Sequence, residues 1–285
     1  MIEDGRASSS VRKNFNVLHS AVKHVVSTKR LRYDPLAGVR TPRIVVKEPN
    51  YLDAGNRAKL ISFLDISQAT PVNVGIPIAL YTGMREDEVC GLRWMDVDLD
   101  QRIIHVRNVV ARNKGKLYEK EPKTKSGKRD IPFGEDLERA LRNRLANVRA
   151  ECDMAHVSFS QGMYVIGGLG DGSGKYMIPR KLWADWKALA DSLGLVGVMG
   201  RVPCFHDLRH TNATVATHMP GTDLKSVQMN LGHSSIKSTV DVYAGDDPEA
   251  RRDIAQRTAS ALRLVPEGAK VIQLGSKRRR TGTVG

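Results

Sequence analysis

The chain has 285 residues, of which 41% are hydrophobic, and its formal net charge is +14 with a pI of about 9.8. The hydrophobic content suffices for a buried core and excludes a wholly disordered chain, and no uncharged apolar run is long enough to cross a bilayer. Cys90, Cys152 and Cys204 lie far apart, which excludes a disulfide framework and a C-x-x-C zinc site. The positive charge favours a nucleic acid partner, and we expect a cytoplasmic protein without a secretory signal.

The first 50 residues predict one helix followed by a linker. From about residue 10 to 30, apolar residues recur at steps of four and three, which places them on one face of a helix that Ser10 is positioned to cap. These residues are Val11, Phe15, Leu18, Val22 and Val25. Residues 31–50 are basic and interrupted by proline and glycine, as in a linker between domains.

The remainder predicts an α+β fold that is mostly α. We expect helices over residues 53–65, 74–81 and 86–93, and then strands over 102–112, 117–121 and 129–133, with Ser126 and Gly127 as turn residues. After Gly134 the pattern is mostly helical, apart from a glycine-rich loop at 167–174. Helices, a small antiparallel three-stranded sheet and more helices do not follow the alternating order of a parallel sheet.

The first candidate site segment is TGMREDEV, residues 82–89. Gly83 is suited to turn the chain out of one helix, and Arg85 then opens the next. A guanidinium at such a corner presents a planar fork to an oxyanion. The alternative is an ordinary surface arginine paired with Glu88 three residues on.

The second segment is HDLRH, residues 206–210. His206 and Arg209 are three residues apart and share one helix face, whereas Leu208, Val215 and Met219 are expected to face the core. An imidazole that moves a proton beside a guanidinium that holds charge suits a phosphate. The alternatives are an ordinary polar helix start and metal binding by His206 and His210, which the adjacent positive charge disfavours.

Two further segments contain candidate residues. A short helix marked by Leu224, Val227 and Leu231 is expected to end at Gly232, which leaves His233 in a loop ten residues before Tyr243. A lone tyrosine is more often a half-buried core residue than a nucleophile. The basic run PKTKSGKR, residues 122–129, predicts a hairpin that contacts phosphates or brings a lysine to protonate a leaving oxygen.

Together these segments resemble the tyrosine recombinases, the group of phage integrases and Xer-type enzymes. Arg85 in TGMREDEV, HDLRH, LGHSS and TVDVYAG occur in that family's order, and PKTKSGKRDIP resembles its catalytic hairpin. The resemblance runs from about Tyr51 to Gly245. Residues 1–40, with Pro35 and Val39, are similar to the end of the family's core-binding domain. We therefore expect a core-binding remnant at 1–40, a catalytic domain at 50–265 and a basic disordered tail at 266–285.

The resemblance implies a role for each candidate residue. Tyr243 would attack the scissile phosphate, forming a 3′-phosphotyrosyl bond, while Arg85 and Arg209 clamp the non-bridging oxygens. His206 would assist proton transfer and His233 would hydrogen-bond the phosphate. Lys123, with Lys125 as its rival, would protonate the departing 5′-oxygen. Glu88 and Asp207 are interpreted as supports for the arginine and histidine.

Phosphoryl transfer of this kind needs preorganised positive charge and a nucleophile that conserves the phosphodiester energy in a covalent bond. No cofactor and no metal are therefore expected. The implied partners are double-stranded DNA at attachment sites, three further copies in a tetramer on DNA, and accessory directionality or bending proteins. A helix over residues 249–264 would dock on a neighbouring protomer or pack on its own domain.

Three functions remain as hypotheses from the sequence. The leading one is an active recombinase in phage or prophage integration and excision. The second is a catalytically idle DNA-binding remnant, and the third is a nicking and closing enzyme similar to a topoisomerase.

Overall fold

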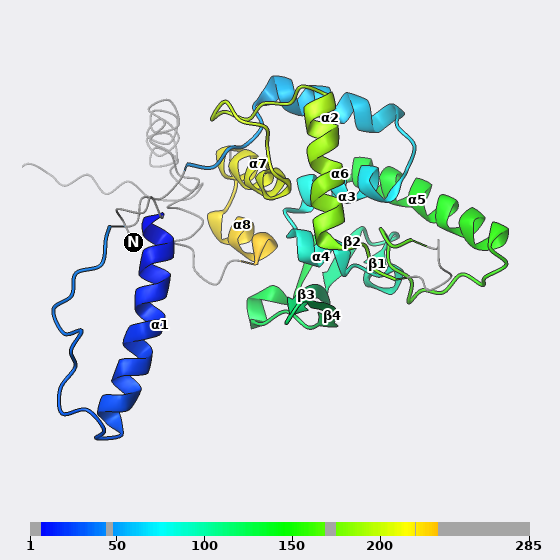
Figure 1. Cartoon of the computed structure of the whole chain (residues 1–285). Coiled ribbons are helices and arrows are strands. Elements are labelled where there is room, and N and C mark those ends of the chain that lie inside the picture. Colours follow the sequence, from blue (N-terminus) through cyan, green and yellow to red (C-terminus); the bar gives the residue numbers. More distant parts are fainter. Residues whose placement is uncertain (1–6, 44–47, 169–174, 220, 233–285) are drawn as a thin grey trace, which may run out of the picture.

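The computed structural model describes residues 7–43, 48–168, 175–219 and 221–232 (Figure 1). Eight α-helices lie in these ranges, in an α+β arrangement with two small antiparallel sheets, as the sequence predicts. No helix in the described part of the chain is long and apolar enough to cross a membrane. The helices are α1 Ser8–Ser27, α2 Ala54–Ile66, α3 Pro71–Thr82, α4 Glu86–Cys90, α5 Glu135–Met154, α6 Pro179–Ser192, α7 Phe205–His218 and α8 Leu224–Leu231.

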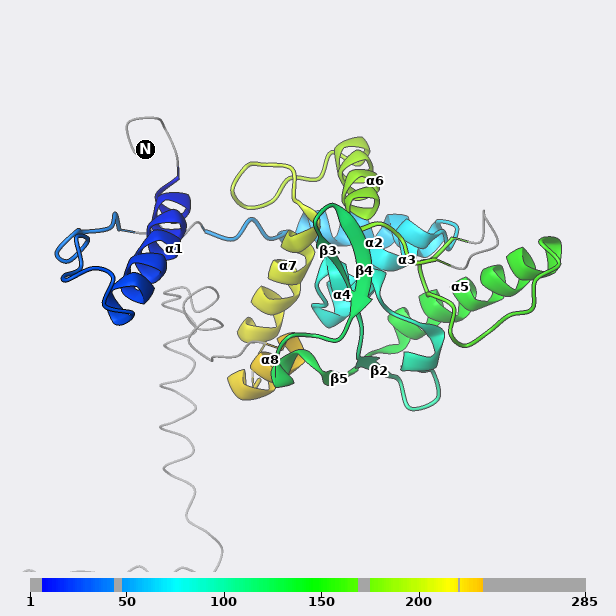
Figure 2. The ribbon, with the colours of Figure 1, turned by 60° about the horizontal axis from the view of Figure 1, so that its bottom comes forward.

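Helix α1 confirms the predicted N-terminal helix but not its predicted cap. The N-cap residue is Ala7, and Ser10 lies inside the first turn, where its backbone N–H donates to the Ala7 carbonyl. The helix buries none of its residues, and Val17 and Leu18 on it are more than half exposed. Both ribbon views show α1 apart from the other described helices (Figures 1 and 2).

Helix α3 is the centre of the main domain, and α4, α5, α6 and α7 all contact it. Most of its residues are buried, because the sequence VGIPIAL is apolar on every face of the helix. It begins three residues earlier than expected because Thr70 caps it: the side-chain oxygen of Thr70 accepts from the Asn73 N–H, and Pro71 occupies the first helical position.

A three-stranded antiparallel sheet is present, as predicted, in the order β1-β2-β5, but its composition differs from the prediction: β1 was not expected, and the strand expected over 117–121 belongs to the second sheet. Its strands are β1 Val97–Asp98, β2 Ile103–Val106 and β5 Arg129–Pro132. A second sheet is the hairpin of β3 Val109–Asn113 and β4 Lys116–Lys120, which turns at Lys114 and Gly115, both at positive φ.

The prediction of one strand over residues 102–112 is wrong. Those residues form β2 and β3, which belong to different sheets. The inward-facing side of the chain changes between them: Ile104 and Val106 are buried on alternate positions, and then Val109 and Val110 are buried in succession. At the break, the carbonyl of Asn108 lies against Gly91, where a Cβ would be only 2.9 Å from that oxygen.

Candidate active site

A sharp corner between α3 and α4 positions Arg85, as the sequence predicts. Gly83 ends α3 with φ +66° and Arg85 is the N-cap residue of α4. The Arg85 backbone N–H donates to Oε2 of Glu88 at 2.9 Å, and its Nη1 is 2.9 Å from Oε1. Glu88 is 2% exposed, whereas the Arg85 side chain is 36% exposed. The ion pair between Arg85 and Glu88 that the sequence offered as an alternative is therefore present. It holds the Arg85 guanidinium on its buried side and leaves the rest of the group accessible to solvent.

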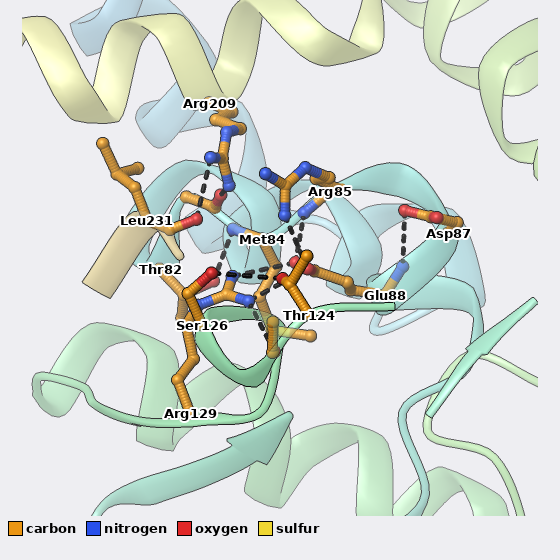
Figure 3. Close-up of polar contacts among 12 residues, drawn as sticks. Thr82, Met84, Arg85, Asp87, Glu88, Thr124, Ser126, Arg129, Arg209 and Leu231 are labelled. Carbon is orange, nitrogen blue, oxygen red and sulfur yellow. Dashed lines mark hydrogen bonds and ion pairs between the residues drawn. The ribbon is translucent and has the colours of Figure 1, made fainter. Parts of the chain in front are cut away.

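The same buried carboxylate holds a second arginine that was not recognised from the sequence. Arg129, at the start of β5, places Nη1 2.9 Å from Oε1 and Nη2 2.8 Å from Oε2 of Glu88. Burial raises the pKa of Glu88, but hydrogen bonding and charge from Arg129 and Arg85 outweigh burial and bring this pKa below its ordinary value. Glu88 is thus a carboxylate shared between two guanidiniums (Figure 3).

Arg209 contacts the corner between α3 and α4 from a third helix, α7. It lies on α7, is 2% exposed, and donates from Nη1 to the Gly83 carbonyl at 2.6 Å and from Nη2 to the Leu231 carbonyl at 2.8 Å. These carbonyls lie at the C-terminal ends of α3 and α8, where the helix dipoles favour positive charge. Figure 3 shows Arg209 and Arg85 side by side at the end of α3.

His206 lies in the first turn of α7. Asp207 accepts the backbone N–H of Cys204 at 2.8 Å, which caps this helix. His206 is an exposed residue, but the atoms packed around its ring remove part of its hydration, and this desolvation, together with the charges of His210, Arg209 and Arg85, lowers the pKa of His206 to about 4. His206 is therefore a neutral imidazole at pH 7, able to accept a proton.

Metal binding by His206 and His210 has no geometric support. Their rings stand edge to face with centroids 4.8 Å apart, at an angle of 87°. Among the residues that the structure describes, no group of three or more His, Cys, Asp or Glu side chains is placed to hold a metal ion.

Met219, expected in the core with Leu208, is 57% exposed because it follows the end of α7.

Arg85 and His206 open into one cleft of about 350 Å³, which also contains two arginines that were not singled out from the sequence. Arg112 reaches it from β3 and Arg180 from the first turn of α6. Three guanidiniums and the N-terminus of α6 give this cleft groups that are suited to an anion, beside the carboxyl groups of Glu86 and Asp87. The lining residues are Arg85, Glu86, Asp87, Val110, Arg112, Leu117, Pro179, Arg180 and His206.

The structure describes the remaining candidate residues, Lys123, Lys125, His233 and Tyr243, to different extents. Lys123 is exposed, in the segment between β4 and the short 3-10 helix η2 Lys125–Gly127, and Figure 3 shows its neighbour Thr124 beside Arg85 and Glu88. Only the backbone of Lys125 is described. His233 and Tyr243 lie outside the described residues, as do the expected helix over 249–264 and the expected basic tail.

The described chain nevertheless reaches the residue before His233. Gly232 ends α8 with φ +66°, as the sequence predicts, one residue after the Leu231 carbonyl that Arg209 binds. The described chain therefore ends next to a backbone carbonyl that Arg209 binds.

Residues 50–250 match the phage integrase family. The chain therefore belongs to that family, the tyrosine recombinases. A XerC-like tyrosine recombinase of Caldanaerobacter subterraneus is 24% identical, over 90% of this chain and 67% of the relative. The ICEBs1 integrase of Bacillus subtilis is 23% identical over 92% and 68%, and a Xylella fastidiosa XerC is 27% identical over 87% and 78%.

Solved structures agree on the fold of this tyrosine recombinase. The Tn1549 transposon integrase in complex with a circular intermediate DNA superimposes with a TM-score of 0.70 at 23% identity, covering 90% of this chain and 82% of that one. A lambda integrase dimer bound to a core site superimposes with a TM-score of 0.54 at 17% identity, covering 86% and 62%. At these identities the likeness establishes the fold.

Proposed function

We propose that this tyrosine recombinase cuts and rejoins double-stranded DNA at attachment sites, as an integrase, through a covalent bond to Tyr243. The observation that supports this most strongly is the convergence of Arg85, Arg209 and His206 on the corner between α3 and α4. Phosphoryl transfer accumulates negative charge on the phosphate oxygens, and fixed guanidiniums stabilise that charge without reorganisation.

In the proposed reaction, the Tyr243 oxygen attacks the scissile phosphorus and the bond from phosphorus to the 5′-oxygen breaks. Arg85 and Arg209 bind the non-bridging oxygens. Neutral His206 takes the phenol proton, and His233 hydrogen-bonds the phosphate. Lys123, or its rival Lys125, gives a proton to the departing 5′-oxygen. The resulting 3′-phosphotyrosyl bond keeps the phosphodiester energy for rejoining.

In the proposed complex, a DNA strand passes over Arg85. Arg112 and Arg180 line the same cleft as Arg85 and His206, so they are placed to neutralise phosphates that flank the scissile one. Such contacts bind DNA of any sequence, and sequence recognition would then need base contacts elsewhere.

We extend the proposal to organisation. Residues 1–40 are the end of a core-binding domain, 50–265 form the catalytic domain, and 266–285 are a basic tail. Four copies assemble on two DNA sites in the cytoplasm, with accessory bending or directionality proteins. The role is integration and excision of a phage or prophage.

The test uses a nicked duplex from the chromosomal DNA that flanks the coding region, in which the fragment released by cleavage diffuses away. We expect a covalent protein–DNA adduct with the parent chain and none with Tyr243→Phe, measured by denaturing gel electrophoresis. Equal adduct from both proteins overturns the assignment of the nucleophile. Salt-dependent binding without adduct from the parent supports an idle DNA-binding protein instead.

A further inference from the structure

Arg129 joins three elements through one guanidinium. In addition to its two bonds to Glu88 on α4, its Nε donates to the Asn230 carbonyl at the end of α8 at 2.6 Å, and its Nη1 donates to the Gly127 carbonyl in η2 at 3.2 Å. The Arg129 side chain is 6% exposed. It is not among the residues that line the open cleft beside Arg85 and His206.

The packing around this junction leaves little freedom. A Cβ at Gly232 would lie 2.7 Å from the Ser126 carbonyl oxygen and 2.9 Å from Nη1 of Arg129. A Cβ at Gly127 would lie 2.6 Å from the Pro122 side chain. The end of α8, the basic segment 122–128 and Arg129 are thus in contact at van der Waals distance, and α8 also packs on β5.

We propose that Arg129 is a positioning residue, which holds the lysine-containing segment 122–128 against the corner that presents Arg85. This rests on the proposed function above. Glu88 is the shared point: it binds Arg85 on one side and Arg129 on the other, so the segment and the corner are fixed to one buried carboxylate (Figure 3). A planar fork can make these bonds in three directions at once, whereas a lysine ammonium on a single stem cannot.

The proposal predicts that losing Arg129 harms delivery of the proton to the leaving oxygen more than it harms attack on phosphorus. A duplex with sulfur in place of the bridging 5′-oxygen separates the two effects. When the bond from phosphorus to sulfur breaks, the electron pair stays on sulfur, which leaves as a thiolate without a proton, because a thiol has a pKa of about 8.5. The result does not depend on whether Lys123 or Lys125 is the acid.

The experiment measures single-turnover adduct formation by Arg129→Lys on the adduct-forming duplex with oxygen and with sulfur at the cleaved position. We expect the rate on oxygen to fall about 100-fold and the rate on sulfur to fall less than about tenfold. Both rates come from one preparation, so their ratio is independent of the fraction of folded protein. The matched control is Arg142→Lys, an exposed arginine paired with Glu138 on α5, which should leave the ratio unchanged.

Equal losses on the two duplexes, or no loss on oxygen, overturn the proposal, because a purely structural ion pair predicts either result. If circular dichroism shows that Arg129→Lys does not fold, the double variant Glu88→Gln with Arg129→Met is used instead. Its ratio is compared with that of Glu88→Gln alone, because both variants lose the bond from Arg85 to the Glu88 carboxylate. A parent chain that forms no adduct on either duplex refutes the proposed function rather than the role of Arg129.

Discussion

At the residue scale, the surroundings of Glu86 in the cleft disfavour the charged form of its carboxyl group. Its Oε1 is buried without a hydrogen-bond partner among the residues that the structure describes. Burial, and then the charge of Asp87, raise the pKa of Glu86 to about 7. An ionisable group kept in such a place beside Arg85 and His206 is a typical feature of functional clefts.

We predict that Glu86→Gln stabilises the protein more at pH 8 than at pH 5. The folded-state pKa lies above the unfolded value, so the parent loses stability as pH rises from about 4.5 through about 7. With a discount for solvent screening, the gain is on the order of 1 kcal/mol, or about 2–4 °C in melting temperature. Thermal unfolding at both pH values measures it. An equal shift at pH 5 and pH 8 would show that the charge of Glu86 is not responsible.

At this scale, the candidate catalytic residues were easier to predict from the sequence than the residues that hold them in place. Arg85, His206 and Arg209 can be predicted as site residues because each sits in a short local motif. The Glu88 bond to Arg85 was foreseen from three-residue spacing, but the bond from Arg129, 41 residues away, depends on how β5 packs against α4. Arg112 and Arg180 were missed for the same reason, since only the tertiary fold brings them to the cleft.

At the element scale, the end of α3 determines where Arg85 lies. Gly83 has φ +66°, and a Cβ there would lie 2.6 Å from Cδ2 of Leu231 and 2.9 Å from Oδ1 of Asn212. Its carbonyl also accepts from Arg209. Glycine is therefore required both by backbone conformation and by the close approach of α7 and α8.

We predict that Gly83→Ala costs more stability than Gly115→Ala. Gly115 has φ +83° with nothing within 4 Å of an added Cβ, so its substitution reports the backbone cost alone, about 1–2 kcal/mol. Gly83→Ala adds steric overlap with α8, and we expect a further loss of about 1–3 kcal/mol. Urea unfolding of both variants measures the difference. Equal losses would mean that α8 does not pack against this corner as described.

Helix ends and strand breaks were the least predictable elements. The helix expected over 86–93 ends at Cys90, because the following backbone pairs with distant chain: the Trp94 N–H donates to the Met163 carbonyl, and Arg93 forms a β-bridge with Tyr164. Helix α1, which has an apolar stripe, and helix α3, which is apolar on every face, were predicted in type and approximate position. Pairing between remote segments leaves no local periodicity from which to predict it.

At the scale of the whole molecule, one domain gathers basic side chains from elements that are far apart in sequence. Arg85 comes from the N-cap of α4, Arg112 from β3, Arg180 from α6, and His206 and Arg209 from α7. The net charge of +14 suggested a polyanion, but only the fold concentrates guanidiniums in one cleft. Membership of the phage integrase family agrees with that arrangement.

The central claim is that these basic side chains act on a phosphate attacked by Tyr243. The most direct test is to locate the covalent bond between the protein and the DNA. The adduct with the nicked duplex is digested with nuclease and trypsin, and the peptides are sequenced by mass spectrometry. We predict that the peptide spanning residues 238–251 gains the mass of a phosphorylated nucleotide remnant, with the modification on Tyr243. A nucleotide attached to any other residue would contradict the account.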